Sequence, residues 1–238
     1  AVDIFKIFNG NLATDAPAII AASNEMDAYM LDLIAERRSA PRDDLLSDLI
    51  SAEQEGDRLS TDELLSMANA LLLAGTDTTR NQLACAIALF AQHPEQFELM
   101  RSNRDLTSQA VEEVMRYLGA VRGTGRYASE EIIYRDLIFP QGTLIFPNFV
   151  AANHDAQKFE EPLAFDITRE GGTPHLTFGS GIHYCLGAFL ARAELQEAFS
   201  VIADRLPNLR LDGTVIWKPL QNGIWGPERL PIAFDSGH

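Results

Sequence analysis

The pattern of hydrophobic and polar positions predicts a chain that is mainly helical. Apolar residues recur every three or four positions over several stretches, which is the spacing of one face of an α-helix. Start and stop signals such as Pro94 and Pro207 bound these stretches. The predicted helices cover residues 17–38, 43–55, 60–93, 94–101, 105–118 and 188–206, with one further helical turn at 148–153. The last helix is expected to bury Leu190, Leu195, Phe199, Ile202 and Leu206.

A minor β component is predicted from short runs rich in β-branched and aromatic residues. Residues 132–134 and 144–146 have this composition, and Pro140-Gln141-Gly142 is a turn sequence between strands. The last thirty residues alternate weakly and end in the strand-like run 230–234. Residues 154–174 are rich in proline, glycine and charge, and we expect them to be irregular. The fold class expected from the pattern is therefore mainly α with small β-sheets.

The longest predicted element is the helix over residues 60–93. Ser60 and Glu63 form a capping box at its start. About thirty residues at a rise of 1.5 Å make a rod of about 45–50 Å. Residues 64–74 are apolar nearly all round, so we expect this helix to be buried in the middle of the fold.

The centre of this helix carries an unusual sequence, Gly-Thr-Asp-Thr-Thr at residues 75–79. Glycine and threonine are poor helix formers. A threonine hydroxyl that bonds the carbonyl four residues back, which for Thr78 is that of Ala74, would bend the helix and open a groove. Taken alone, the sequence fits a kink without chemistry as well as it fits a functional groove.

A second unusual stretch is residues 178–187, Phe-Gly-Ser-Gly-Ile-His-Tyr-Cys-Leu-Gly, directly before the predicted helix 188–206. Its glycines let the backbone take angles closed to other residues and let a flat ligand come close. A thiolate just ahead of a helix N-terminus is stabilised by backbone amides. The stretch therefore suits a metal bound through one soft protein ligand, although a lone cysteine is more often a small buried hydrophobe.

Other kinds of site fail on spacing in this stretch. Zinc needs about four protein ligands, and no second cysteine lies near Cys185. A nucleophile elbow needs glycine two residues before Ser180, where Phe178 stands. Gly179-Ser180-Gly181 lacks the third glycine of a dinucleotide fingerprint, and no Gly-Lys-Ser/Thr follows for a phosphate loop.

The cysteine stretch resembles the haem-binding signature of the cytochrome P450 family, Phe-x-x-Gly-x-His/Arg-x-Cys-x-Gly. The five matching residues are Phe178, Gly181, His183, Cys185 and Gly187. The resemblance implies that haem b (iron protoporphyrin IX) is the cofactor and that Cys185 is the axial ligand of its iron. It also implies that His183 and, on looser spacing, Arg126 contact the haem propionates.

The quintet in the long helix also resembles a motif of this family. Ala74-Gly75-x-Asp77-Thr78 matches the oxygen-activation motif, where the helix crosses the distal face of the haem. The resemblance implies that Ala74 and Gly75 lie against the cofactor. It further implies that the hydroxyl of Thr78 steadies dioxygen and that Asp77 passes protons towards it.

Glu113 and Arg116 lie three residues apart on a predicted helix and can pair on one face. The usual interpretation of such a spacing is an exposed ion pair worth under about 1 kcal/mol. Because the pair falls between the other two motifs, it resembles the Glu-x-x-Arg motif of the cytochrome P450 family, whose partner arginine falls on Arg169. The resemblance implies a buried charged cluster behind the haem with a structural role.

Composition narrows the class of protein further. The chain has 238 residues, of which 46% are hydrophobic and 22% charged, as in ordinary globular proteins. Two cysteines, Cys85 and Cys185, make no disulfide framework, and no signal peptide or run of about 18 apolar residues is present. We therefore expect a soluble, cytoplasmic protein. The net charge of −15 argues against nucleic acid and anionic membranes as partners.

The resemblance extends over the whole chain, with the motifs in the family's order. It implies a bacterial-type haem-thiolate monooxygenase that takes electrons from a ferredoxin/ferredoxin reductase-type donor and inserts one atom of O2 into a substrate. The substrate-facing segments would be residues 121–124 and 220–225. Ala74, Val121, Ile224 and Trp225 suggest a small-to-medium apolar organic molecule.

Members of the family have a large N-terminal portion before anything that matches Ala1. We therefore expect residues 1–238 to be the C-terminal portion of a single cytochrome P450 domain. Such a chain would associate with the N-terminal portion, associate with itself or be marginally stable. Two alternatives remain open: a non-enzymatic scaffold that does not hold haem, and a peroxygenase that uses hydrogen peroxide directly.

Overall fold

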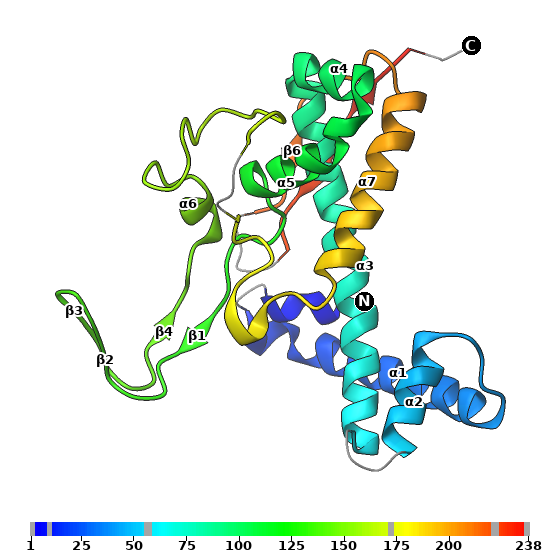
Figure 1. The fold of residues 1–238 in the computed structure, drawn as a ribbon. Coiled ribbons are helices and arrows are strands. Elements are labelled where there is room, and N and C mark those ends of the chain that lie inside the picture. Colours follow the sequence, from blue (N-terminus) through cyan, green and yellow to red (C-terminus); the bar gives the residue numbers. More distant parts are fainter. Residues whose placement is uncertain (1–2, 9–10, 55–58, 171–173, 220–223, 236–238) are drawn as a thin grey trace. The chain divides into compact units, whose positions relative to one another are not determined.

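The computed structural model describes residues 3–8, 11–54, 59–170, 174–219 and 224–235, and it has a mainly helical fold with small antiparallel sheets (Figure 1). The chain forms two compact units, Ala1–Asp77 and Thr78–His238. Helix α3 (Thr61–Gln92) runs through the boundary between them. The fold class predicted from the sequence is confirmed.

The first unit consists of η1 (Ile4–Phe8), α1 (Leu12–Ser39), α2 (Leu45–Gln54) and the first half of α3. Helix α1 begins five residues before the predicted start, so that Pro17 lies inside it. Proline has a helical φ and removes only one backbone donor, so a single proline near the exposed start of a long helix is tolerated. The core of this unit contains Met30, Ile34, Ile50, Leu64 and Ala68.

Helix α3 begins as predicted. The backbone N–H of Ser60 donates to Glu63 Oε2 at 2.8 Å, and that of Glu63 donates to Ser60 Oγ at 3.3 Å, which is a capping box. The prediction that residues 64–74 are buried all round is wrong, because Leu64 and Ala68 are buried while Met67 and Leu72 are exposed. In the first unit, only one face of α3 packs in the core formed with α1 and α2.

The second unit is built around four helices: the rest of α3, α4 (Pro94–Ser102), α5 (Thr107–Tyr117) and α7 (Ala188–Arg205). A short turn, η2 (Arg104–Leu106), precedes α5. The ring of Phe90 is the centre of the core, with ring centroids 5.4 Å from Phe97, 6.1 Å from Phe165 and 5.2 Å from Phe199. These helices match the predicted ranges to within two residues at each end.

All strands of the described chain form two-stranded antiparallel sheets. The pairs are β1 (Arg126–Tyr127) with β4 (Leu144–Ile145), β2 (Ile132–Tyr134) with β3 (Leu137–Phe139), β5 (Arg210–Leu211) with β8 (Ile232–Ala233), and β6 (Ile216–Trp217) with β7 (Pro227–Arg229). The predicted strands at 132–134 and 144–146 are present, but each pairs with a strand that the pattern did not indicate. Figure 1 shows β2 and β3 as a hairpin that projects from the helices of the second unit.

The chain between the hairpin and α7 is held by short elements. Helix α6 (Phe149–Asn153) is capped by Asn148, whose Oδ1 accepts from the N–H of Ala151 at 3.0 Å. Coil follows over the described residues up to the short turn η3 (Gly181–His183). The prediction that α7 buries Leu190 is wrong, since this side chain is 61% exposed. None of the helices described here is both long and apolar enough to span a bilayer.

Candidate functional site

The cysteine stretch forms a tight loop directly before α7. The N–H of Cys185 donates to the carbonyl of Phe178 at 2.9 Å, which closes the loop across its base. Gly179 and Gly181 have φ values of 72° and 69°, in the left-handed region that favours glycine. The thiol of Cys185 is exposed, and Gly187 behind it is the N-cap of α7. The loop therefore presents one sulfur atom to the outside, ahead of a helix N-terminus.

The surface around this thiol is apolar. Ile182, Leu186 and Phe189 are all largely exposed, with Phe189 at 84%, although side chains of this kind are normally buried. A Cβ added at Gly181 would have no neighbour within 4 Å, so the loop has free space beside it. An apolar surface beside a thiol suits a large flat ligand better than a bare ion.

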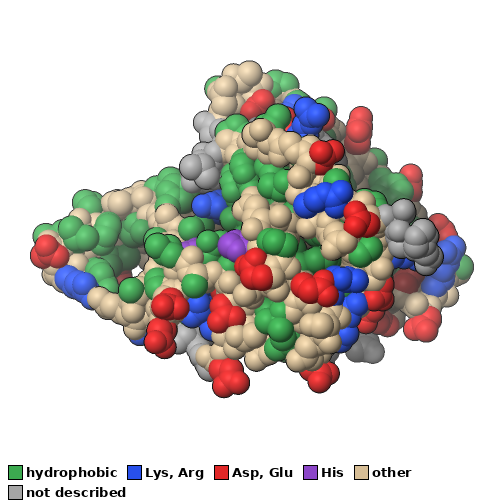
Figure 2. All heavy atoms as spheres, turned by 90° about the horizontal axis from the view of Figure 1, so that it is seen from above, with side chains coloured by type: hydrophobic (Ala, Val, Ile, Leu, Met, Phe, Trp, Pro, Cys, Tyr) green, Lys and Arg blue, Asp and Glu red, His purple; other side chains and the backbone are tan. Residues whose placement is uncertain are grey.

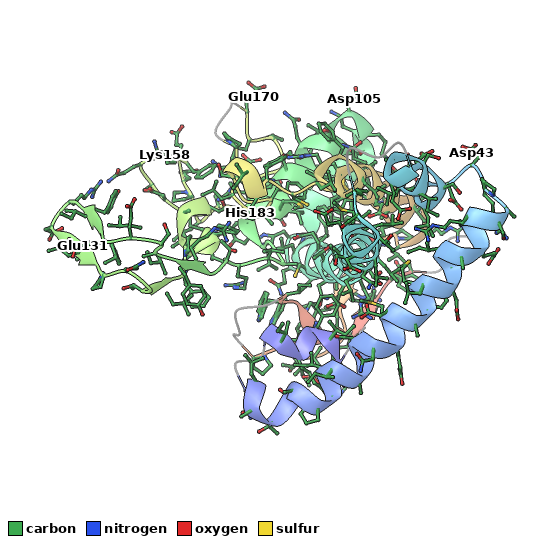
Figure 3. All side chains as sticks on the ribbon, turned by 90° about the horizontal axis from the view of Figure 1, so that it is seen from below. Asp43, Asp105, Glu131, Lys158, Glu170 and His183 are labelled. Atoms are coloured by element: carbon green, nitrogen blue, oxygen red, sulfur yellow. The ribbon has the colours of Figure 1, made fainter. Side chains whose placement is uncertain are left out.

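Two basic residues predicted for the site lie on exposed positions of the second unit. His183 ends the short turn η3 inside the loop (Figure 3). Arg126 begins β1, and its Nη1 donates to Thr124 Oγ1 at 2.7 Å and to the carbonyl of Gly125 at 2.8 Å. Phe178 is buried at the base of the loop and does not reach the surface.

Glu113, Arg116 and Arg169 come together as a buried cluster. Arg116 Nε and Nη2 donate to the two carboxylate oxygens of Glu113 at 2.7 and 2.8 Å, and both side chains are 3% exposed. Arg169 Nε lies 3.3 Å from Glu113 Oε2. The remaining donors of Arg116 bond the carbonyls of Asn153, Pro162 and Ala164. The pair is thus not the exposed one that its spacing usually indicates, and it anchors the coil to α5.

The quintet of the long helix keeps helical geometry throughout, because α3 runs unbroken from Thr61 to Gln92. Thr76 Oγ1 donates to the carbonyl of Leu72 at 2.7 Å, the bond to the fourth residue back that threonine makes in helices. Ala74 and Gly75 are exposed, and a Cβ added at Gly75 would meet nothing within 4 Å. Asp77 and Thr78 are half-buried.

The two segments predicted to face a substrate meet in the second unit. Val121 and Ile224 form an isolated antiparallel bridge, and the N–H of Trp225 donates to the carbonyl of Ala120 at 2.8 Å. The guanidinium of Arg122 lies 4.4 Å from the centre of the Trp225 ring. Residues 220–223 of the second segment lie outside the described residues.

Sequence reasoning missed a second polar cluster next to the cysteine loop. Arg192 of α7 makes two bonds to Glu112 of α5, at 2.6 and 3.1 Å, and His175 Nε2 lies 3.4 Å from the same carboxylate. Burial raises the pKa of Glu112, but the neighbouring His175 and the bonds from Arg192 outweigh this effect and lower the pKa to about 2. The available signal was the position of these residues beside known motifs: Glu112 precedes Glu113, and Arg192 follows Cys185 by seven residues.

A mainly helical chain that presents one exposed thiol ahead of a helix is built like a haem-thiolate protein. Comparison with known sequences agrees, because the family model for cytochrome P450 matches residues 1–206. The chain belongs to the cytochrome P450 family. Among the described residues no group of three or more His, Cys, Asp or Glu could hold a metal ion without such a cofactor.

Relatives and solved structures agree on this family. Cytochrome P450 CYP107DY1 of Priestia megaterium is 43% identical over 81% of this chain and 47% of its own length. The 6-deoxyerythronolide B hydroxylase of Saccharopolyspora erythraea is 38% identical over 90% of this chain and 54% of its own. The tirandamycin C-bound P450 monooxygenase TamI has a TM-score of 0.84 and 37% identity over 92% of this chain and 56% of its own. The chain therefore spans about half the length of the relatives that it matches.

Haem b is the cofactor of this family, and the residues at the loop fit it. Cys185 supplies the single soft ligand, and the exposed apolar side chains Leu186 and Phe189 supply a surface for a flat macrocycle. His183 and Arg126 are polar and exposed, so both are accessible to the carboxylates of a haem. The donor set and its surroundings are thus those of a haem site with one protein ligand.

Proposed function

We propose that this chain is part of a haem-thiolate monooxygenase that inserts one atom of O2 into a C–H bond of a small-to-medium apolar organic substrate. Two electrons for each turnover would come from a redox partner, for which a ferredoxin with its reductase is the expected class. The observation that carries the proposal is the exposed thiol of Cys185 on a closed loop ahead of α7.

The loop residues bind and orient the cofactor in this proposal. When bound, a haem with a thiolate ligand supplies the cleavage of the O–O bond and the oxidation of the substrate. Cys185 would hold the iron, and the bond from its N–H to the carbonyl of Phe178 fixes the backbone that carries the thiol. His183 and Arg126 would hold the propionates, and Ala74 and Gly75 would leave room for the cofactor because neither has a large side chain.

Asp77 and Thr78 handle protons and water in the same proposal. The hydroxyl of Thr78 can donate a hydrogen bond and accept one, so it can hold a proton at the oxygen-binding side of the cofactor. The Asp77 carboxyl can pass protons from solvent to it, because half-burial leaves a route to water. Val121, Ile224 and Trp225 offer apolar groups to the substrate.

The spectrum of the reduced, CO-treated protein tests the ligand assignment. A thiolate-ligated haem gives a strongly red-shifted Soret band, and a histidine- or water-ligated haem does not. We expect the red-shifted band in the wild-type protein and its loss in Cys185→Ser, because a mostly protonated hydroxyl replaces a soft thiolate. A red-shifted band that persists in Cys185→Ser would sink the proposal.

Thr78→Ala tests the distal role separately. We expect haem content and the CO band to survive, while less product forms for each reduced nicotinamide consumed and more dioxygen leaves as hydrogen peroxide. Thr76→Ala is the matched control, since it removes a neighbouring hydroxyl that bonds the carbonyl of Leu72. If Thr78→Ala forms as much product for each reduced nicotinamide as the wild type, Thr78 affects only the shape of the helix. Activity with peroxide but none with a reductase and ferredoxin would favour a peroxygenase.

A second candidate is a scaffold that keeps this fold without holding haem. It is motivated by the large apolar surface around Cys185, which lies open in the chain as it stands. Haem titration separates the two candidates. Saturable binding at one haem per chain supports the monooxygenase, and absence of binding by a folded chain supports the scaffold.

A further inference from the structure

The polar cluster of Glu112, His175 and Arg192 joins three elements beside the cysteine loop. Arg192 Nε donates to Glu112 Oε1 at 2.6 Å and Nη2 donates to Oε2 at 3.1 Å, which is a bidentate pair between α7 and α5. His175 lies in the coil before the loop, is 4% exposed, and faces the same carboxylate with Nε2 at 3.4 Å. Glu112 therefore holds the guanidinium of Arg192 in a fixed plane.

The guanidinium of Arg192 contacts the loop at two points. Its centre lies 4.5 Å from the centre of the Phe178 ring, and Nη1 donates to the hydroxyl of Tyr184 at 3.3 Å. Tyr184 precedes Cys185 in the chain, and the carbonyl of Phe178 accepts the N–H of Cys185 at 2.9 Å. One planar cation thus touches both sides of the loop that presents the thiol.

His175 extends this arrangement below the loop. Its Nδ1 accepts from the N–H of Thr177 at 3.1 Å, so in the neutral ring Nε2 carries the hydrogen. This buried Nε2 lies 3.4 Å from Glu112 Oε2 and makes no hydrogen bond among the described residues. The ring of His175 also lies 5.5 Å from that of Phe178. The ring of Phe178 therefore contacts both an arginine and a histidine, and its carbonyl accepts the N–H of Cys185.

If Arg192 served only to hold α5 and α7 together, its contacts with Phe178 and Tyr184 would not be needed. Helices α5 and α7 already pack in one core through Val111, Val114, Leu195 and Phe199. Exposed ion pairs add under about 1 kcal/mol to such packing. A lysine would serve that purpose as well, but only the flat fork of arginine can pair bidentately and stack on a ring at the same time.

We propose that Arg192, held in place by Glu112, is a positioning residue that fixes the orientation of the Cys185 loop. Its relevance to the cofactor rests on the proposed function, but its effect on the loop does not. Among the described residues, the bond from Arg192 Nη1 to Tyr184 Oη is the one hydrogen bond that a helix side chain makes to the loop. Losing the guanidinium should free the loop while the helix core stays closed.

Amide hydrogen exchange of the chain without haem tests the loop directly. We expect Arg192→Gln to speed exchange in the peptide that spans residues 178–187 by at least about fivefold, because the bond from Cys185 to Phe178 opens more often. Peptides of the α5 and α7 core should exchange at the wild-type rate. Arg192→Lys should restore only part of the protection, since the charge is kept and the planar contact is lost.

Arg101→Gln is the matched control. Arg101 of α4 also ties its helix to α7, through Nε to the carbonyl of Ala203 at 2.8 Å, and its Nη1 bonds Glu98 of its own helix at 2.6 Å. Among the described residues it makes no such bond to the loop. We expect no change in the loop peptide for this variant. Equal loss of protection in loop and core for Arg192→Gln, or unchanged loop exchange, would overturn the proposal. If Arg192→Gln does not fold, Glu112→Gln must give the same loop-specific loss.

The CO spectrum of the haem-loaded protein gives an independent measurement. In Arg192→Gln we expect the share of the unshifted Soret band, relative to the thiolate-type band, to rise at least about threefold over wild type, with Arg192→Lys between them. A wild-type ratio in Arg192→Gln would contradict the positioning role. If the wild-type chain binds no haem, the proposed function fails, and the exchange experiment still decides whether Arg192 holds the loop.

Discussion

At the scale of single residues, two Glu–Arg pairs with the same spacing have opposite surroundings. Glu113 and Arg116 are buried on α5, whereas Glu98 and Arg101 lie three apart on α4 with Glu98 largely exposed. A buried carboxylate that loses its charge leaves its arginine partner without compensation in a dry environment, whereas an exposed partner turns to water. The same pattern in the sequence therefore carries different energies.

Replacing Glu113 tests this difference. We expect Glu113→Gln to lower the free energy of unfolding by about 3–5 kcal/mol, because Arg116 and Arg169 are left with an uncharged partner. Glu98→Gln is the control and should lower it by under about 1 kcal/mol. Equilibrium unfolding in urea measures both. Equal effects of the two substitutions would show that burial does not determine how much the Glu113–Arg116 pair contributes to the free energy of unfolding.

The pKa of Glu112 predicts a pH dependence. This pKa lies at about 2 in the folded chain, against an ordinary value of 4.5, so the folded state binds the proton more weakly than the unfolded state. The stabilisation is fully present above pH 4.5 and is lost as the pH falls towards 2. We expect the difference in unfolding free energy between wild type and Glu112→Gln to shrink over this window. A difference that is constant from pH 6 to 2 would contradict the assignment.

Sequence reasoning placed Cys185 and the Glu113–Arg116 pair because their motifs are local. It did not find Arg192, whose partner Glu112 lies 80 residues away. An arginine on the polar face of an amphipathic helix has the same sequence pattern whether it is solvated or paired with a carboxylate of another helix. Leu190 was wrongly assigned to the core for a related reason, since helical spacing does not tell which apolar face is covered.

At the scale of elements, helices were predicted well and strands poorly. Long amphipathic stretches such as α1 and α7 repeat their signal several times, so an error of a few residues at one end leaves the helix in place. Strands β1 and β4 have two residues each, too few to show alternation. Their pairing depends on contacts made by the chain between them.

Helix α3 provides a prediction at this scale. Gly75 lies inside a regular helix with nothing within 4 Å of an added Cβ, so we expect Gly75→Ala to stabilise the chain by up to about 1 kcal/mol. Gly142→Ala is the control, because Gly142 has equal space but a φ of 83°, and we expect it to destabilise by about 1–2 kcal/mol. Urea unfolding measures both. Under the proposed function, Gly75→Ala should also weaken haem binding. If Gly75→Ala destabilises the chain without haem, the conclusion that there is space for a Cβ at this position is wrong.

At the scale of the whole molecule, charge and apolar surface are distributed differently. Acidic side chains are scattered over the face seen in Figure 2, in keeping with the net charge of −15. Apolar side chains instead gather on the projecting β2–β3 hairpin, where Ile133 and Ile138 are paired in register and both exposed. Exposed apolar strands of this kind pair with other chains.

From this exposed apolar hairpin we predict that the chain associates with itself. We expect the wild-type chain to sediment as larger species at rising concentration, and the double variant Ile133→Lys, Ile138→Lys to shift towards monomer. Ile20→Lys is the control, since Ile20 is an exposed isoleucine on α1, outside the hairpin. Sedimentation velocity gives the distribution. Unchanged association in the double variant would show that another surface mediates self-association. The apolar residues around Cys185 would then be substituted next.

The sequence was sufficient for the family, because three motifs occur in order along 238 residues. The sequence did not predict that the chain divides into two compact units within α3. The sequence of a continuous helix does not show where one set of packing partners ends and another begins. The expected burial of residues 64–74 failed because only one face of this part of α3 packs on α1 and α2.

The buried Glu113–Arg116 pair also has a consequence for the order in which the chain folds. Arg116 bonds carbonyls that lie 37, 46 and 48 residues further along, so its donors are satisfied only after a long segment has closed into a loop. Closing a loop of this length lowers chain entropy before any contact compensates. Docking of residues 153–169 on α5 should therefore be a late step of refolding. Variants of this coil should slow folding less than they speed unfolding.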